Sequence, residues 1–162
     1  MRKINIIYVG GIKTSEKYYQ DAVDEYIKRL SGDFKIANIE LKEEFIPEKP
    51  GKSDIEICLK KEGLKILDKI NNNSFKIALC IEGKRLNSEE FASILYGEKA
   101  INSQSVDFII GSSHGLSDEV KKSMDFLLSL SDMTFTHRLA RVMLSEQIYR
   151  AYSIETGKKY HK

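Results

Sequence analysis

The chain has 162 residues, of which 41% are hydrophobic and 31% are charged, as in a single globular domain with one core. The net charge of +2 is too small to identify a nucleic-acid partner by itself. Two cysteines without metal-ligand spacing exclude a zinc module, and no apolar segment has the length of a membrane span or a secretory signal. We therefore expect one cytoplasmic domain over residues 1–162, without a metal.

The first forty residues predict two strands around one helix. Residues 4–9 are a short apolar run rich in β-branched side chains, closed by a glycine pair, and this pattern indicates a buried strand. Apolar and tyrosine side chains then recur at helical spacing over residues 18–30, where a Gly-Asp pair ends the helix. Residues 35–41 predict the second strand.

The middle of the chain predicts a long loop, a helix and a third strand. Residues 42–52 contain two prolines and a glycine, and they predict a loop of the length at which lids occur. Ser53 and Glu56 have the spacing of a capping box, which predicts a helix that runs to about residue 70. After an Asn-rich turn, the apolar residues 75–81 predict a strand covered on both faces, as in a parallel sheet.

The last part of the chain predicts three helices and two further strands. A second capping-box pattern predicts a helix over residues 87–100. Residues 106–110 and 126–130 predict strands, and a short helix over residues 117–123 separates them. An approximate apolar stripe predicts the final helix over residues 137–154.

Strands that alternate with helices indicate an α/β domain with a mostly parallel sheet. Ligands of such sheets bind beyond the carboxyl ends of the strands. The loops that follow the last three predicted strands are therefore the candidate site, namely residues 82–86, 111–116 and 131–136.

Three short motifs carry candidate chemistry, and each has a plainer explanation. The glycines of residues 111–115 allow close approach to a ligand or simply form a turn, and they match neither a dinucleotide nor a P-loop pattern. Positive charge over residues 137–141 opposes the dipole at the start of a helix, which indicates either an anionic partner or a solvated first turn. The tail, residues 160–162, can stack on a base and pair with a phosphate, or it is a frayed end.

Charge is unevenly distributed along the chain. Residues 136–162 contain six Lys or Arg against two Asp or Glu, so the rest of the chain is slightly acidic. A basic end on a near-neutral body suits contact with a polyanion, and a solvated tail rich in lysine is the alternative.

Together these motifs match a known pattern. The matching segments are Tyr8-Val9-Gly10-Gly11, Tyr26-x-x-Arg29-Leu30, Leu79-x-Ile81-x-Gly83-Lys84, Asp107-Phe108-x-Ile110-Gly111, Gly115-Leu116, Met133-Thr134-Phe135-x-His137-x-x-x-Arg141, Glu146-Gln147-Ile148-Tyr149-Arg150-Ala151 and Tyr160-His161-Lys162. The chain thereby resembles the bacterial 23S rRNA (pseudouridine1915-N3) methyltransferases, of the large-subunit methyltransferase H type, in the SPOUT superfamily. The C-terminal segments are the most specific part of the resemblance, which covers essentially the whole chain.

The resemblance implies an α/β fold whose C-terminal segment forms a trefoil knot, and a homodimer that acts on large-subunit rRNA in the assembled ribosome. It also implies S-adenosylmethionine (SAM) as the methyl donor, bound in the knot mainly by backbone groups. The residues that match the cofactor-binding motifs of the family are Leu79, Gly111, Leu130, Ser131, Asp132, Met133, Thr134 and Phe135.

The chain departs from the family pattern at two positions. Ser112 stands where a second glycine is usual, and it fits if its backbone φ is negative. Thr136 stands where a proline usually precedes the histidine, and threonine is a suitable helix N-cap. Both departures put SAM affinity in question rather than the fold.

The implied reaction moves a methyl group from SAM to N3 of a pseudouridine, and N3 must lose a proton. His137 and His161 are the candidate acceptors, because a neutral imidazole accepts a proton near pH 7. Candidate RNA contacts, for which the charged members have fold stabilisation as an alternative, are Arg138, Arg141, Arg150, Tyr160 and Lys162.

Three other functions stay open on sequence alone. A knotted methyltransferase acting on another RNA, such as tRNA, has the same motifs. A ribosome-binding protein that kept the fold and lost SAM is consistent with the changes at Ser112 and Thr136. A flavodoxin-like ligand binder needs a phosphate loop after the first strand, and residues 10–13 match one poorly.

Overall fold

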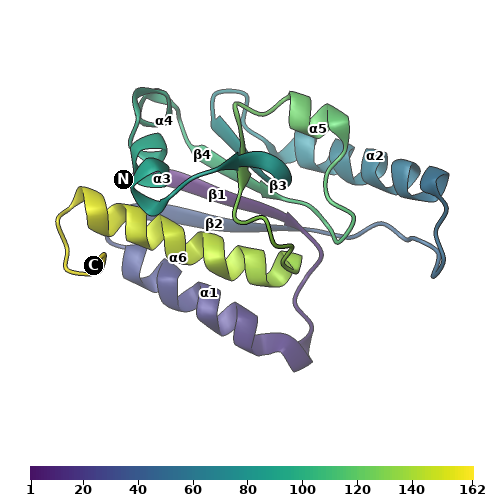
Figure 1. The fold of residues 1–162 in the computed structure, drawn as a ribbon, viewed down its shortest axis with the longest axis horizontal. Coiled ribbons are helices and arrows are strands. Elements are labelled where there is room, and N and C mark those ends of the chain that lie inside the picture. The colour runs from purple at the N-terminus through teal and green to yellow at the C-terminus, as the bar shows by residue number, and fades with distance from the viewer.

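Five parallel strands form one sheet in a computed structural model that describes residues 1–162, and their spatial order is β2-β1-β4-β3-β5 (Figure 1). The strands are β1 (Arg2–Val9), β2 (Phe34–Leu41), β3 (Phe75–Arg85), β4 (Val106–Ile110) and β5 (Phe126–Ser129). Every neighbouring pair is parallel. The predicted parallel sheet is confirmed, and the carboxyl ends of all five strands lie at one edge.

Helices cover both faces of the sheet. The longest, α6 (His137–Glu155), lies beside α1 (Lys17–Leu30) on one face, and α2 (Lys52–Lys69) lies on the other (Figure 1). The remaining helical elements are short: η1 (Thr14–Glu16), α3 (Ser88–Leu95), α4 (Glu98–Asn102) and α5 (Asp118–Lys122). None of these helices combines the length and the apolar composition that crossing a membrane requires.

The alternation of side chains along each strand produces two cores. In β1, Ile6 and Tyr8 face the larger core with α1, α3, α4 and α6, where Leu144 and Ile148 of α6 are fully buried. The intervening Ile7 faces the smaller core with α2 and α5. Strands buried on both faces account for the uniformly apolar runs in the sequence.

Three predicted boundaries differ from the structure. The strand predicted over residues 75–81 extends to Arg85, so residues 82–85, predicted as part of a loop, belong to β3. The helix predicted over residues 87–100 is two helices, because the extended backbone of Gly97 ends α3 and caps α4. A Cβ at Gly97 would lie 2.9 Å from the carbonyl oxygen of Ser93, so this break requires glycine. The capping box predicted at Ser53 is also wrong: the Asp54 carboxylate instead accepts from the backbone N–H of Gly51 over 2.8 Å.

A buried carboxylate joins the segments at the amino edge of the sheet. Asp107, at 0% exposure, accepts hydrogen bonds from Asn5 Nδ2 over 2.7 Å, Ser105 Oγ over 2.8 Å and the backbone N–H of Asn71 over 3.1 Å. Three donors satisfy a charge that would otherwise be costly to bury. This edge is fixed, whereas the loops of the candidate site leave from the opposite edge.

A buried guanidinium attaches α6 to the sheet. Arg141 is 2% exposed, and its central carbon lies 3.8 Å from the centre of the Tyr8 ring on β1. Its Nη2 donates to Gln20 Oε1 on α1 over 2.9 Å. A cation over an aromatic ring is attracted by the ring quadrupole, most strongly where water is excluded. Arg141 therefore positions the first half of α6 against both β1 and α1.

Candidate functional site

Three strand ends meet at the carboxyl edge of the sheet, where the sequence predicts the site. In the ladder between β3 and β4, Leu79 pairs with Ile110, the residue before Gly111. In the ladder between β3 and β5, Leu79 also pairs with Leu128, close to Leu130. The structure therefore brings together three segments that were predicted to bind the cofactor, although they are far apart in the sequence.

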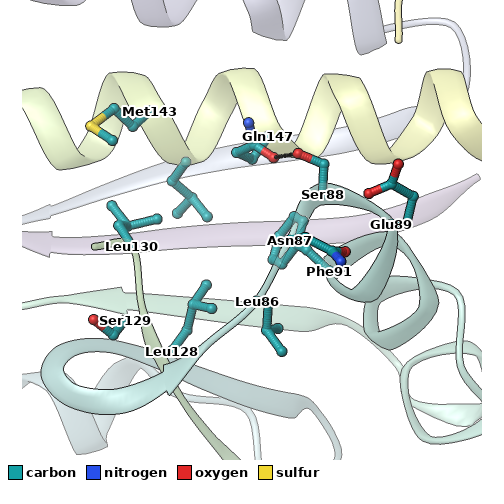
Figure 2. A pocket seen from close by; sticks show the side chains of 11 residues that line it. Leu86, Asn87, Ser88, Glu89, Phe91, Leu128, Ser129, Leu130, Met143 and Gln147 are labelled. Atoms are coloured by element: carbon teal, nitrogen blue, oxygen red, sulfur yellow. Dashed lines mark hydrogen bonds between the residues drawn. The ribbon is translucent and has the colours of Figure 1, made fainter. Parts of the chain in front are cut away.

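A pocket of about 360 Å³ lies between the end of β5, the start of α3 and the middle of α6 (Figure 2). This volume lies in the range of small-molecule sites, and six of the eleven lining residues are hydrophobic, as is usual for such sites. The lining residues are Leu86, Asn87, Ser88, Glu89, Phe91, Leu128, Ser129, Leu130, Met143, Leu144 and Gln147. Of the predicted cofactor residues, only Leu130 lines this pocket.

Polar groups lie on the α3 side of the pocket. Ser88 Oγ donates to Gln147 Oε1 over 2.9 Å, which links α3 to α6 (Figure 2). The Glu89 carboxylate lies beside them and bonds the His161 ring over 2.7 Å. Ser88, Gln147 and Glu89 are site residues that the sequence did not predict. The capping pattern at Asn87 predicted only where a helix begins. Nothing in the neighbouring sequence indicates which distant helix packs against that helix.

The segment after β5, residues 131–135, runs over the surface. Met133 is 69% exposed, and Asp132 forms an exposed ion pair with Arg85. The Ser131 hydroxyl accepts from the backbone N–H of Met133 over 3.0 Å, which closes a tight turn. This turn leaves the thioether of Met133 uncovered beside the strand ends.

The glycine loop, residues 111–115, folds back on itself. Ser112 and Gly115 form an isolated bridge, and Gly115 has a φ of +87° that favours glycine. A Cβ at Gly111 would lie 2.2 Å from the carbonyl oxygen of Gly115. The loop's own backbone therefore requires glycine at position 111, whatever ligand approaches it. Ser112 has no positive φ, so the serine is accommodated as the sequence analysis required.

His137 begins α6 in an enclosed position. Thr136 caps the helix by accepting from the backbone N–H of Leu139 over 3.3 Å, so the absence of proline does not disturb the helix start. The His137 ring is partly buried, and its Nε2 has no hydrogen-bond partner. A Cβ at Gly10 would lie 3.3 Å from that nitrogen. Burial, followed by the charge of Arg138, lowers the pKa of His137 and favours its neutral form.

The C-terminal tail is docked on α6, so the alternative of a frayed end is wrong. Tyr160 donates from its hydroxyl to Glu146 over 3.0 Å, packs edge-on against Tyr149 and lies under the guanidinium of Arg150. Burial and hydrogen bonding raise the pKa of Tyr160 well above its usual value. His161 bonds Arg150 through one ring nitrogen, over 3.3 Å, and Glu89 through the other.

The two candidate histidines lie apart within one chain. His161 contacts Arg150, and the rise of about 1.5 Å per residue puts Arg150 about 20 Å from His137 along the axis of α6. A single chain therefore does not bring both rings to one reacting atom.

The predicted RNA contacts divide into internal and exposed residues. The prediction is wrong for Arg141, because its guanidinium is buried against Tyr8 and holds the fold. Arg138 pairs with Glu16 over 3.1 Å and Arg150 with Glu146 over 2.6 Å, each about a quarter exposed. Lys162 is exposed. Phosphate contact from Arg138 or Arg150 thus competes with an internal carboxylate.

Comparison with known proteins identifies the family. A family model described as a predicted SPOUT methyltransferase matches residues 2–161. The chain belongs to the SPOUT methyltransferase family.

Two curated relatives are similar over their full length, and both are named ribosomal RNA large subunit methyltransferase H. The protein of Oenococcus oeni is 46% identical over 162 residues, which cover all of both chains. The protein of Clostridioides difficile is 50% identical over 159 residues, which cover 98% of this chain and 99% of the relative.

A solved structure shares the fold at low identity. It is described as a probable methylase family protein from Haemophilus influenzae, with a TM-score of 0.53 and 13% identity. The match covers 98% of this chain and 70% of the other. At this identity the likeness concerns the fold alone.

The crowding at Gly111 gives a testable expectation. Gly111→Ala places a Cβ against the Gly115 carbonyl, so we expect a melting temperature several degrees below that of the native protein, since each kcal/mol shifts a domain of this size by about 2–4 °C. Gly32→Ala is the matched control, because nothing lies within 4 Å of the added methyl group. Calorimetric melting of both variants makes the comparison, and equal melting temperatures would show that the loop tolerates the side chain.

Proposed function

We propose that the protein is a SAM-dependent methyltransferase that methylates N3 of pseudouridine 1915 in the 23S rRNA of the assembled ribosome. The observation that carries the proposal is full-length identity of 46–50% to proteins named ribosomal RNA large subunit methyltransferase H, within the SPOUT methyltransferase family. The meeting of three predicted cofactor segments at Leu79 supports it, because that edge is where α/β sheets bind ligands.

The residues at this edge fit a nucleoside cofactor with a polar tail. The pocket combines Leu128 and Leu130, at and after the end of β5, with the hydroxyl of Ser88 and the amide of Gln147, which suits a ligand with an apolar ring and polar edges. β5 lies at the edge of the sheet, so the backbone N–H and C=O groups on its outer side do not pair with another strand. In the proposal, SAM is held around Leu79, Gly111 and residues 130–135, and it supplies a methyl group activated by its sulfonium.

The chain must also accept the proton of N3. His137 is the stronger candidate, because its lowered pKa favours the neutral ring and its Nε2 has no partner. Both ring nitrogens of His161 are already engaged, by Arg150 and Glu89. His161 therefore serves better to place the tail at the pocket rim. Lys162, which is exposed, and Arg138 and Arg150 at partial exposure are the proposed phosphate contacts.

A trefoil knot is part of the proposal for the C-terminal segment. Residues 80–83 leave the ladder between β3 and β5, which resumes with Lys84 opposite Leu128. At Gly83 the two segments are so close that a Cβ would lie 2.6 Å from the backbone of Leu128. This close passage of the chain beside β5, just before α6, supports the proposed threading of the C-terminal segment at this place.

The proposed enzyme is a homodimer, because one chain leaves its candidate groups separated and its apolar surface uncovered. Tyr18 on α1 is 61% exposed, and Met133 and Leu139 flank the start of α6 with 69% and 36% exposure. The ion pair between Glu16 and Arg138 places the starts of α1 and α6 side by side. A second copy seated there would cover these side chains and bring its tail toward His137.

The dimer is tested by sedimentation. We expect the native protein to sediment as a dimer at micromolar concentration, and Leu139→Asp to shift it toward monomer, because a charge would be buried at the interface. Leu64→Asp is the control, since Leu64 is 59% exposed on α2, on the opposite face of the sheet. A native protein that is monomeric and still active would contradict the proposal.

Methyl transfer tests the activity itself. With labelled SAM, we expect label in ribosomes that lack the modification, recovered as N3-methylpseudouridine after digestion to nucleosides, and little label in free rRNA. Ribosomes that already carry the modification are the control and should accept none. Label found in tRNA instead would favour the alternative substrate. Absence of both transfer and SAM binding by calorimetry would favour a non-catalytic ribosome-binding protein.

The docked tail leads to a further expectation. Removal of residues 160–162 deletes the contacts of Tyr160 with Glu146 and Arg150, so we expect a lower melting temperature together with loss of most methyl transfer. The control is Lys159→Ala, because Lys159 is exposed and lies directly before the deleted residues. His161→Ala at saturating ribosome separates two roles: a slower single-turnover rate indicates a part in chemistry, and recovery indicates binding. Full activity of the truncated protein would exclude the tail from the site.

A further inference from the structure

A second buried carboxylate lies beneath the glycine loop. Glu62 of α2 is 2% exposed, and no Lys, Arg or His forms an ion pair with it. Its Oε2 accepts from Ser112 Oγ over 2.8 Å. Its Oε1 accepts from the backbone N–H of Glu44 over 3.1 Å and lies 3.6 Å from the Cys58 thiol. A buried carboxylate without a cation depends on such donors, so each contact matters.

The donors to Glu62 come from separate segments of the chain. Ser112 belongs to the glycine loop, and Glu44 belongs to the segment that follows β2. The second segment is also held by Lys65, which pairs with Glu44 over 2.6 Å and donates to the Lys42 carbonyl over 2.9 Å. Glu62 is therefore the point at which α2, the glycine loop and the segment after β2 are joined.

The neighbouring residue keeps α2 close to the far end of that loop. A Cβ at Gly63 would lie 2.7 Å from Ser117 Oγ and 3.1 Å from a methyl group of Val120. This contact sets the distance between α2 and the start of α5, just beyond the glycine loop. The glycine loop is thus held at Ser112 by a hydrogen bond, and Ser117, which follows the loop, is held by packing.

We propose that Glu62 is a positioning residue that holds residues 111–115 in their ligand-binding conformation through Ser112. The inference rests on the proposed function for its ligand, SAM. The contact needs a hydroxyl at position 112, which a glycine would lack, so the serine anchors the loop to α2. A loop that is already held in its binding conformation binds the ligand without the entropic cost of being ordered. If the loop is loosened, the apparent affinity falls in proportion to the fraction of molecules whose loop still has the binding conformation.

The test compares Glu62→Gln and Ser112→Ala with the native protein in SAM binding by calorimetry. We expect Kd to rise about tenfold in each variant, as it would if about a tenth of the molecules kept the competent loop. The double variant should be little weaker than either single one, because both remove the same contact. Ser112→Ala leaves the Glu62 side chain unchanged, so it decides the matter if Glu62→Gln fails to fold. Unchanged Kd in Ser112→Ala would overturn the proposal.

Asp107→Asn is the matched control for a general loss of stability. Asp107 is also a fully buried carboxylate with three donors, but it lies at the opposite edge of the sheet. Both amide variants should melt at lower temperature, and only Glu62→Gln should weaken SAM binding. An equal rise of Kd in Asp107→Asn would mean that Glu62 acts only through stability, against the proposal.

Hydrogen exchange separates this proposal from the proposed function. Without ligand, amides of residues 111–116 should exchange several-fold faster in Ser112→Ala than in the native protein, and amides of β1 should be unchanged. If the native protein binds no SAM, the proposed function fails. The exchange data still test whether the contact between Glu62 and Ser112 holds the loop. Faster exchange confined to the loop then supports it, and equal exchange refutes it.

Discussion

The position of β3 between β4 and β5 is the constraint on which the rest of the structure depends. Because the three strands are parallel and Leu79 pairs with both Ile110 and Leu128, their carboxyl ends come into register at one edge. The loops that follow therefore have little freedom in where they begin. Helices on both faces bury the strands, so the open edge is where these loops can receive a ligand.

Three buried charged side chains hold the segments around both edges of the sheet. Asp107 closes the amino edge, Arg141 seats α6 on Tyr8, and Glu62 lies under the glycine loop. None of the three is neutralised by an opposite charge within an ion pair. Each is satisfied by hydrogen bonds or an aromatic ring, contacts that depend more on direction than a simple charge pair does. These contacts therefore set the positions of the chain segments that surround each buried side chain.

The tail illustrates how an internal network connects a terminus to a pocket. Glu146 accepts from Tyr160 and Arg150, and Arg150 bonds His161, which reaches Glu89 at the pocket rim. The end of the chain therefore contacts both α6 and α3. The same network keeps His161 at a distance from His137, and this separation is one argument for the proposed dimer.

The sequence by itself determined the strands, their parallel pairing and two of the three loops at one edge, whereas residues 82–85 of the third extend β3. Hydrophobic runs and helical spacing report burial locally, so the order of elements followed without the structure, apart from ends such as the break at Gly97, which depends on close contact with Ser93. Motif resemblance also marked Leu79, Gly111 and Leu130, and Leu79 pairs with Ile110 and Leu128, which lie one and two residues before the other two.

Only the tertiary structure decided which charged residues turn inward. Arg141 matches an RNA-contact pattern in sequence, yet it is stacked on Tyr8, because helix periodicity does not reveal what lies opposite a given face. Glu62 reads as one more charge on a lysine-rich helix and is in fact buried against Ser112, fifty residues away. Contacts between distant segments arise from the packing of the whole chain, so the local pattern of residue types does not predict them.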